Sequence, residues 1–181
     1  MPSAYTFTDY SPDWPLAFEQ AAACLRDLLD DDLVVIHHIG STSVPGLAAK
    51  PIIDLLPVAR SIAIIEAKTP RLEAAGYRAW GEYGLPGRRF FTRDQHGYRT
   101  HNIHIYGQDD PDIERHLAFR NYLRTHPAVR DEYAAVKRAA YARYPADIGG
   151  YSDSKHGWIQ TVEAQARAWY RQCGSDPVSM L

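Results

Sequence analysis

One segment of this chain, HHIGSTSVPGLAAKPIIDLLPV over residues 37–58, combines anion-binding residue types with a single carboxylate. Gly40 and Ser41 follow an apolar run. A glycine that leaves a strand lets backbone N–H groups approach an anion, and the adjacent hydroxyl adds a hydrogen bond. Thr42 and Ser43 supply two more hydroxyls. The spacing matches neither G-x-x-x-x-G-K-[ST] nor G-x-G-x-x-G, so the pattern predicts either a phosphate site of another kind or a plain turn.

Asp54 lies inside the second apolar run of this segment, between Ile53 and Leu55. A carboxylate on a buried strand is costly unless it is paired, hydrogen-bonded or bound to a metal ion. If a phosphate-type corner joins the two runs, Ser41 and Asp54 meet at one rim of a sheet, where Asp54 could hold Mg²⁺ that bridges a triphosphate. The structural alternative is that a loop amide or Lys50 satisfies Asp54.

The two apolar runs are predicted to be strands. The β-branched run over 33–39 ends at Gly40, and residues 43–49 allow no more than one helical turn. In the run PIIDLLPV, Pro51 fits the first residue of a strand and Pro57 fits its end. The corner and Asp54 would therefore lie on neighbouring strand ends.

Periodicity and Gly/Pro breaks locate the other elements. A helix near 61–75 ends at Gly76, a plausible C-cap. Strands in the first and middle parts, followed by helices, indicate an α+β domain with helices packed on one side of a sheet and a helical C-terminal part. The remaining expected elements are a helix within 11–31, strands within 77–83, 88–93 and 99–107, and helices near 111–125, 127–144 and 152–172.

Composition and charge limit the classes of partner. The 181 residues fit a single domain, 1–181, with a net charge of -2, so no overall positive field attracts a long nucleic acid or an anionic membrane. No apolar run approaches the roughly 20 residues of a membrane span, and the first residues lack a signal-peptide pattern. Cys24 and Cys173 have no metal-type spacing and are expected to be reduced thiols. We therefore expect a cytoplasmic protein; its oligomeric state is left open.

The segment HHIGSTSVPGLAAKPIIDLL resembles the signature of the GrpB family, whose members are similar to the nucleotidyltransferase superfamily of the polymerase-β type. YSPDWPLAFEQAAACL, RTHNIHIY, HLAFRNYLRTHP and YSDSKHGWI extend the resemblance over about residues 10–169. It implies a nucleotidyltransferase-like fold with a mixed β-sheet. The superfamily's Gly-Ser motif falls on Gly40 and Ser41, and its first metal-binding carboxylate falls on Asp54.

The sequence departs from the superfamily pattern at Leu56, where a second carboxylate would lie on the same strand face as Asp54. A site with two metal ions that clamp a phosphoryl group would need ligands from elsewhere. Asn102 and His104, two apart on an expected strand, share one face and are the best candidate ligands. His104 could also polarise a phosphate or act as a base; the alternative is a hydrogen-bonded core histidine.

Basic side chains are available for a triphosphate. His116, Arg120 and Arg124 recur at i, i+4 and i+8 on an expected helix. Arg120 matches the family's Phe-Arg pair and is the preferred phosphate ligand, because a guanidinium reaches two oxygens at once. Arg124 is expected to be solvated.

Three further cations are candidates for the same pocket: Lys155, in the arrangement Tyr151-x-x-x-Lys155, together with Lys50 and Arg99. Each of them could instead be an ordinary surface residue.

Two hypotheses follow from these residues and the resemblance. The first is an Mg²⁺-dependent nucleotidyltransferase that moves a nucleotidyl group from an NTP to a small molecule or protein. The second is a catalytically inactive domain that binds a nucleotide or a phosphorylated metabolite, such as a coenzyme A precursor, because GrpB-like domains also occur joined to dephospho-coenzyme A kinase. A purely structural or assembly role is the third possibility, since fold alone does not imply activity.

Overall fold

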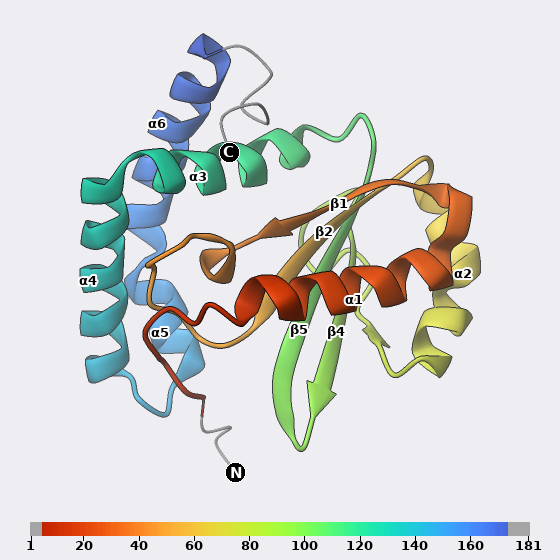
Figure 1. Ribbon diagram of the computed structural model, residues 1–181, viewed down its shortest axis with the longest axis horizontal. Helices are drawn as coiled ribbons and strands as arrows, with labels where there is room; N and C mark the ends of the chain where they lie inside the picture. The colour runs from red at the N-terminus through yellow and green to blue at the C-terminus, as the bar shows by residue number, and fades with distance from the viewer. Residues whose placement is uncertain (1–4, 174–181) are drawn as a thin grey trace.

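The computed structural model describes residues 5–173, and its centre is a five-stranded sheet of order β1-β2-β5-β4-β3 (Figure 1). β2 and β5 are parallel, whereas the other neighbouring strands are antiparallel. The sheet is therefore mixed, as expected. The strands are β1 (Leu33–Ile39), β2 (Ile53–Ala59), β3 (Arg78–Ala79), β4 (Arg89–Gln95) and β5 (Tyr98–Gly107).

The helices begin and end close to the residues that the sequence indicates. Pro111 and Pro127 open α3 and α4, where a missing backbone N–H costs nothing. The C-cap of α2 is Ala75, and Gly76, the residue predicted for this role, follows it with φ of +89°. The helices are α1 (Trp14–Leu29), α2 (Ile62–Ala74), α3 (Pro111–Thr125), α4 (Pro127–Arg143), α5 (Ile148–Ser154) and α6 (His156–Gln172), with short 3-10 turns at Asp30–Asp32 and Ser41–Ser43.

Three expected boundaries were wrong. β2 starts at Ile53 and continues through Pro57 to Ala59. The strand expected within 77–83 shortens to Arg78–Ala79, because the chain turns through positive φ at residues 81, 83 and 84. The single helix expected over 152–172 is two helices, α5 and α6, separated at Lys155.

The two faces of the sheet differ in character. Ile53 and Leu55 of β2 and Ile103 of β5 point toward α1 and α2 and form the main apolar core with them. On the opposite face, Leu56, Val58 and Tyr106 pack against Ile113 and Leu117 of α3. Thus α1 and α2 cover one face, and the C-terminal helical part reaches the other face through α3 (Figure 1).

Strand register fixes the position of the polar residues. Ile39 at the end of β1 lies opposite Asp54, and Asp54 lies opposite Asn102 of β5. Because side chains alternate along a strand, Asp54, Asn102 and His104 share the face that α3 partly covers. The predicted corner, carboxylate and candidate ligands therefore meet at one edge of that face.

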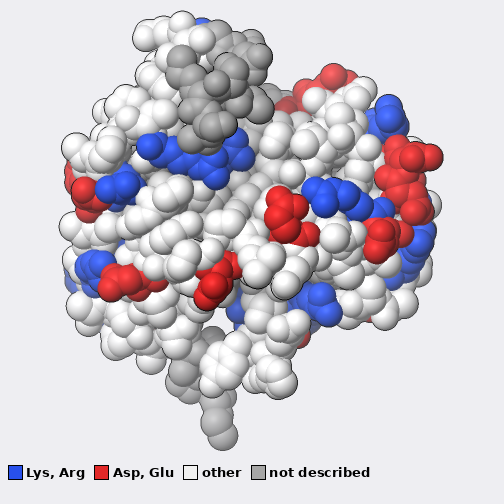
Figure 2. All heavy atoms as spheres, viewed as in Figure 1, with Lys and Arg blue, Asp and Glu red and all other residues white. Residues whose placement is uncertain are grey.

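The surface carries both signs of charge. Figure 2 shows basic and acidic side chains interspersed over the face drawn there, in keeping with the net charge of -2. None of the helices within residues 5–173 has the length and apolar character needed to cross a membrane.

Candidate functional site

A cavity of about 270 Å³ lies at this edge of the sheet, and both Ser41 and Asp54 line it. Its walls come from the corner after β1, from β2 and β5, and from α3, α4 and α5, together with the residue that follows α5. Arg99 and Arg120 do not line the cavity. The other predicted site residues do line it: Gly40, Ser41, Thr42, Lys50, Asp54, Asn102, His104 and Lys155.

The corner requires glycine at position 40 for two reasons. Gly40 has φ of +69°, a conformation that side chains disfavour. In addition, a Cβ atom at this position would overlap Asp54 Oδ2. The turn is held by Ser43, whose hydroxyl donates to the Gly40 carbonyl oxygen at 2.6 Å. This packing brings the backbone of the corner directly against the carboxylate.

Thr42 holds the corner in place through contacts within the chain. Its side chain is 1% exposed, and its hydroxyl lies 3.0 Å from His38 Nε2 and donates to the Ile52 carbonyl at 3.4 Å. Those contacts connect the corner to both β1 and the residue before β2. Of the predicted hydroxyls, Ser41 lines the cavity and hydrogen-bonds Tyr133 of α4 instead of another residue of the corner.

Asp54 accepts a hydrogen bond from one neighbour on β5 and lies close to another. Asn102 Nδ2 donates to Asp54 Oδ1 at 2.8 Å, and His104 Nε2 lies 3.6 Å from the same oxygen. Arg99 donates to Asn102 Oδ1, and Arg88 donates to His104 Nδ1, both at 3.3 Å. A guanidinium can only donate, so the accepting atoms, Asn102 Oδ1 and His104 Nδ1, point toward the arginines and away from Asp54. The two predicted metal ligands therefore face Asp54 with N–H groups.

The donor set around Asp54 does not fit a two-metal site. Leu56, at the position of a second carboxylate, is fully buried in the apolar cluster beneath α3. Asp94 pairs with Arg99, Glu82 accepts from a backbone N–H, and Asp112 pairs with Arg115. Among the described residues that line the cavity, Asp54 is the one acid, and residues 5–173 contain no metal-type group of three His, Cys, Asp or Glu side chains.

Lysine is the most frequent charged residue in the cavity wall. Lys50, Lys137 and Lys155 line it, and the whole chain contains four lysines. Lys137 is 1% exposed, and its Nζ has no hydrogen-bond partner within the described residues. It lies 4.5 Å from the centroid of the Tyr133 ring. Lys50 and Lys155 each lie 5.1 Å from the Tyr151 ring. Aromatic faces thus hold three lysine side chains around one carboxylate.

Burial and mutual repulsion shift these lysines toward the neutral form. Burial, then the charge of Lys155, lowers the pKa of Lys137 to about 6. Burial, then the charge of Lys50, lowers the pKa of Lys155 to about 8. Burial also lowers the pKa of Lys50, and for all three Asp54 acts in the opposite direction. These shifts reflect a cavity wall with three lysines and one acid.

Sequence reasoning missed Lys137 as a site residue. A signal was present, because Tyr133, Lys137 and Ala140 recur at i, i+4 and i+7 and form the buried stripe of α4. A lysine on the apolar stripe of a helix is uncommon unless something else pairs with it. Only the fold, however, brings that stripe opposite Asp54.

The arginines of α3 hold the fold together around the cavity. Arg120 donates to the His38 carbonyl at 3.0 Å and to Asn121 at 2.8 Å, and it does not line the cavity, so we leave it out of the proposed phosphate ligands. Arg124 was expected to be solvated; instead it donates twice to the Ser43 carbonyl, at 2.9 and 2.7 Å. Both arginines therefore attach α3 to β1 and its corner.

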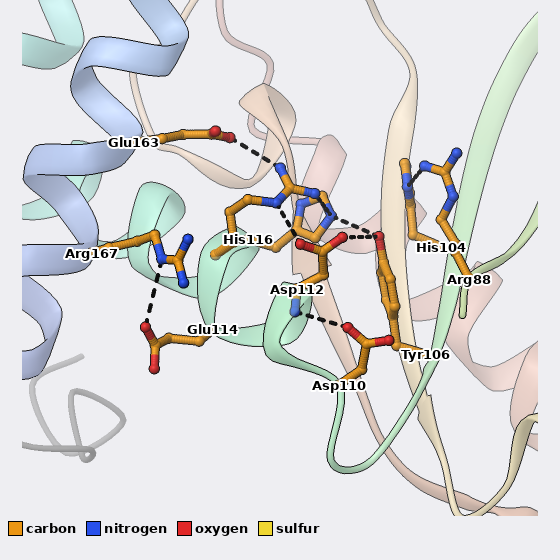
Figure 3. Close-up of polar contacts among 10 residues, drawn as sticks. Arg88, His104, Tyr106, Asp110, Asp112, Glu114, His116, Glu163 and Arg167 are labelled. Atoms are coloured by element: carbon orange, nitrogen blue, oxygen red, sulfur yellow. Dashed lines mark hydrogen bonds and ion pairs between the residues drawn. The ribbon is translucent and has the colours of Figure 1, made fainter. Parts of the chain in front are cut away.

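Beside His104, a network of polar side chains that pair with one another lies between the sheet and α3 (Figure 3). Arg115 donates to Asp112 at 2.9 Å, to Glu163 at 3.1 Å and to His116 at 3.2 Å. The Tyr106 hydroxyl donates to Asp112 at 3.4 Å. His116 belongs to this network and also lines the cavity. Here, unlike at the lysines, acids and bases satisfy one another.

A second cavity, of about 320 Å³, adjoins the first and shares Lys50 and Ile52 with it. Tyr98, which is 59% exposed, and Arg99 contribute to its wall from the start of β5. The structure therefore places Arg99 beside the first cavity, where it orients Asn102.

Comparison with known proteins identifies the family. A family model described as GrpB protein matches residues 5–165. This chain belongs to the GrpB family. The GrpB crystal structure from Enterococcus faecalis has a TM-score of 0.87 and 40% sequence identity, covering 91% of this chain and 99% of that one. The UPF0157 protein YqkA of Bacillus subtilis is 42% identical over 160 residues; the match covers 88% of this chain and 46% of YqkA, so the chain spans less than half of that relative.

More distant matches extend the comparison of GrpB with other proteins. A dephospho-CoA kinase of Mycolicibacterium paratuberculosis is 28% identical over 191 residues, which cover 92% of this chain and 47% of the kinase chain. The structure of Cid1 in complex with its short product ApU gives a TM-score of 0.52 at 16% identity, over 81% of this chain and 48% of Cid1. At that identity the likeness shows the fold, and the fold is nucleotidyltransferase-like.

Proposed function

We propose that the cavity binds the phosphate end of a nucleotide or of a phosphorylated small molecule. The observation that carries this proposal is the convergence of the Gly40–Ser41 corner with Lys50, Lys137 and Lys155 on one cavity. Backbone N–H groups, a hydroxyl and ammonium groups are the donors that phosphate oxygens accept from in proteins. The family membership and the nucleotidyltransferase-like fold agree with a ligand of this class.

The adjoining cavity suits the organic part of such a ligand. It has a more apolar wall, to which Tyr98 and Ile148 contribute, and it shares Lys50 with the phosphate cavity. An aromatic side chain at its rim offers a stacking surface to a nucleobase. The name of the dephospho-CoA kinase relatives supports testing dephospho-coenzyme A, which carries both a base and phosphates.

Thermal-shift measurements with ATP, UTP, dephospho-coenzyme A and pyrophosphate test the proposal. Each compound is used with Mg²⁺ and with EDTA. We expect at least one to raise the Tm, and Ser41→Ala and Lys155→Met to reduce that shift. Lys68→Met is the matched control, because Lys68 pairs with Asp32 outside the cavity and the variant loses the same charge. If no compound raises the Tm, or if Lys68→Met reduces the shift as much as Lys155→Met, phosphate binding in this cavity is contradicted.

Tyr98→Ala examines the second cavity separately. If the base lies there, this variant weakens binding of the nucleotide that binds best and leaves pyrophosphate binding unchanged. Equal weakening of both ligands, or of neither, would remove the second cavity from the proposal while the phosphate site stands.

Nucleotidyl transfer with Mg²⁺ is the second candidate function. It is favoured by the fold and by the position of Asp54 beside the Gly-Ser corner. Asp54 is the residue that would hold the ion, which would neutralise charge on the transferred phosphate, and His104 would act beside it. Turnover of an NTP that requires Mg²⁺ and disappears in Asp54→Asn would establish this candidate; binding of an NTP without turnover on any acceptor tested would favour the binding domain.

A further inference from the structure

We infer that this cavity binds phosphate groups without a divalent metal ion, with the ammonium groups of Lys50, Lys137 and Lys155 supplying the positive charge. This inference rests on the proposed phosphate-binding function and specifies how that site neutralises its ligand. It assigns Lys137 to the binding of the phosphate oxygens.

The balance of charge in the cavity wall favours an anion over a cation. A divalent ion is bound in proteins by several oxygen ligands, of which carboxylates carry the compensating charge. Here three lysines and one acid, Asp54, line the cavity. A divalent cation placed beside Asp54 would be repelled by the charged lysines of this wall, whereas a phosphate group is attracted by them and favours the protonated form of Lys137. The site is therefore suited to a polyanion.

One oxygen of Asp54 is also already engaged, and the other lies against the corner. Oδ1 accepts from Asn102 and faces His104 Nε2, and Oδ2 lies against the Gly40 backbone. These contacts give the carboxylate a structural role, because they join the corner, β2 and β5. In this arrangement Asp54 orients the corner that receives the anion.

Lys137 provides an independent observation that points to an anionic ligand. Its Nζ is buried and has no hydrogen-bond partner within residues 5–173, although an ammonium group carries three donors. Buried polar groups in native proteins are normally satisfied, and an exception calls for an explanation such as a bound ion. A phosphate oxygen in the cavity would satisfy this nitrogen. It would also offset the repulsion that Lys155 and Lys50 exert on it.

The burial of Lys137 further distinguishes it from a solvated surface lysine. Its aliphatic part packs in the stripe of α4 and its Nζ lies near the rings of Tyr133 and Phe7. Held in this way, the amine loses little conformational freedom when an anion binds. We therefore expect a larger effect from Lys137 than from an exposed lysine.

Calorimetric titration of the full chain with inorganic pyrophosphate, in buffer with EDTA, tests the inference. We expect binding in the absence of Mg²⁺ and a loss of about tenfold or more in affinity for Lys137→Met, because a charged hydrogen bond is removed. Lys155→Met should weaken binding in the same direction and serves if Lys137→Met does not fold. Lys68→Met, which removes a lysine outside the cavity, should leave the affinity unchanged.

Asp54→Asn gives the sharpest contrast with a metal site. If the lysines neutralise the ligand, removal of the carboxylate leaves the pyrophosphate affinity equal or higher, since a repulsive charge is lost. If Mg²⁺ bridges Asp54 to the ligand, the same variant loses binding. Pyrophosphate binding that needs Mg²⁺ and Asp54 would overturn the inference and leave the proposed function standing. Folded Lys137→Met and Lys155→Met variants with unchanged affinity would also overturn it. Absence of binding to every compound under either condition would remove the proposed function as well.

Discussion

Two clusters of charged side chains lie on the same face of the sheet and share His116, yet they are built in opposite ways. In the cluster beside His104, Arg115 donates hydrogen bonds to Asp112, Glu163 and His116. In the cavity, three lysines lie around a single acid, and Lys137 Nζ is unsatisfied within the described residues.

We interpret the difference as one between charges that stabilise the fold and charges that a bound anion would satisfy. Partly buried ions are stable when each has a partner, and removal of one partner leaves an uncompensated charge. A buried amine without a partner lowers the stability of the free protein and is relieved when an anion binds. Stability and binding should therefore respond in opposite ways to substitutions in the two clusters.

The largest effect is expected from Arg115→Ala in the paired network. Loss of the guanidinium leaves Asp112 and Glu163 without their partner, and we expect the free energy of unfolding to fall by about 3 kcal/mol. Urea denaturation measures this change. Arg171→Ala, which breaks an exposed pair with Glu114, should cost less than about 1 kcal/mol. Equal losses of unfolding free energy in the two variants would show that the network stabilises the fold no more than an exposed ion pair does.

Gly40→Ala should have the next largest effect, because it disturbs the corner of the cavity. The new Cβ would strain the backbone at φ of +69° and overlap Asp54, and we expect a loss of about 2 kcal/mol together with weaker pyrophosphate binding. Gly81→Ala is the matched control: its φ is +63°, but nothing lies within 4 Å of the added Cβ. A Gly40→Ala variant no less stable than Gly81→Ala would argue against the close packing of corner and carboxylate.

Lys137→Met should make the unliganded protein more stable at pH 7, by about 1 kcal/mol, while it weakens anion binding. Met fills a similar volume and removes an unsatisfied buried amine. Denaturation without ligand and titration with pyrophosphate measure the two effects. Loss of stability together with unchanged binding would assign Lys137 to the fold instead of the ligand.

The stability gain of Lys137→Met should depend on pH. The folded-state pKa of Lys137 is about 6 and its ordinary value is 10.5, so between these values the unfolded chain binds more protons. The wild-type free energy of unfolding therefore rises with pH in this range, relative to the variant. Besides Asp54, which raises this pKa, the groups that face Lys137 are Lys155, Arg138 and Lys50, which lower it. Denaturation at pH 7 and pH 9 should show the gain shrinking; a constant gain would contradict the depressed pKa.

Thr42→Val should have the smallest effect, a loss below about 1 kcal/mol, because it removes one buried hydroxyl that contacts His38 and the Ile52 carbonyl. Thermal unfolding would detect it as a small decrease in Tm. Since Thr42 holds the corner from inside, Ser41→Ala should affect binding more and stability less. The reverse order would exchange the roles assigned to the two hydroxyls.

Local chemistry let the sequence locate much of this site. Gly40, the β-branched run before it and the apolar run around Asp54 predicted two strands joined at a corner, and the register of Ile39 opposite Asp54 agrees with that prediction. Asn102 and His104 were predicted to share a face from their spacing alone, and they do. The role of Arg120 was less predictable, because the spacing of residues along a helix does not show which other element the helix face will contact.

The sequence by itself determined the elements, the corner and the position of the carboxylate, since strand alternation and glycine geometry act over a few residues. Only the tertiary structure decided which charges meet. It brought Lys137 from α4, Lys155 from the end of α5 and Lys50 from the loop before β2 around Asp54, and it used Arg120 and Arg124 to hold α3 against β1. The physical reason is that pairing and burial depend on contacts between residues far apart in the chain, which no local pattern specifies.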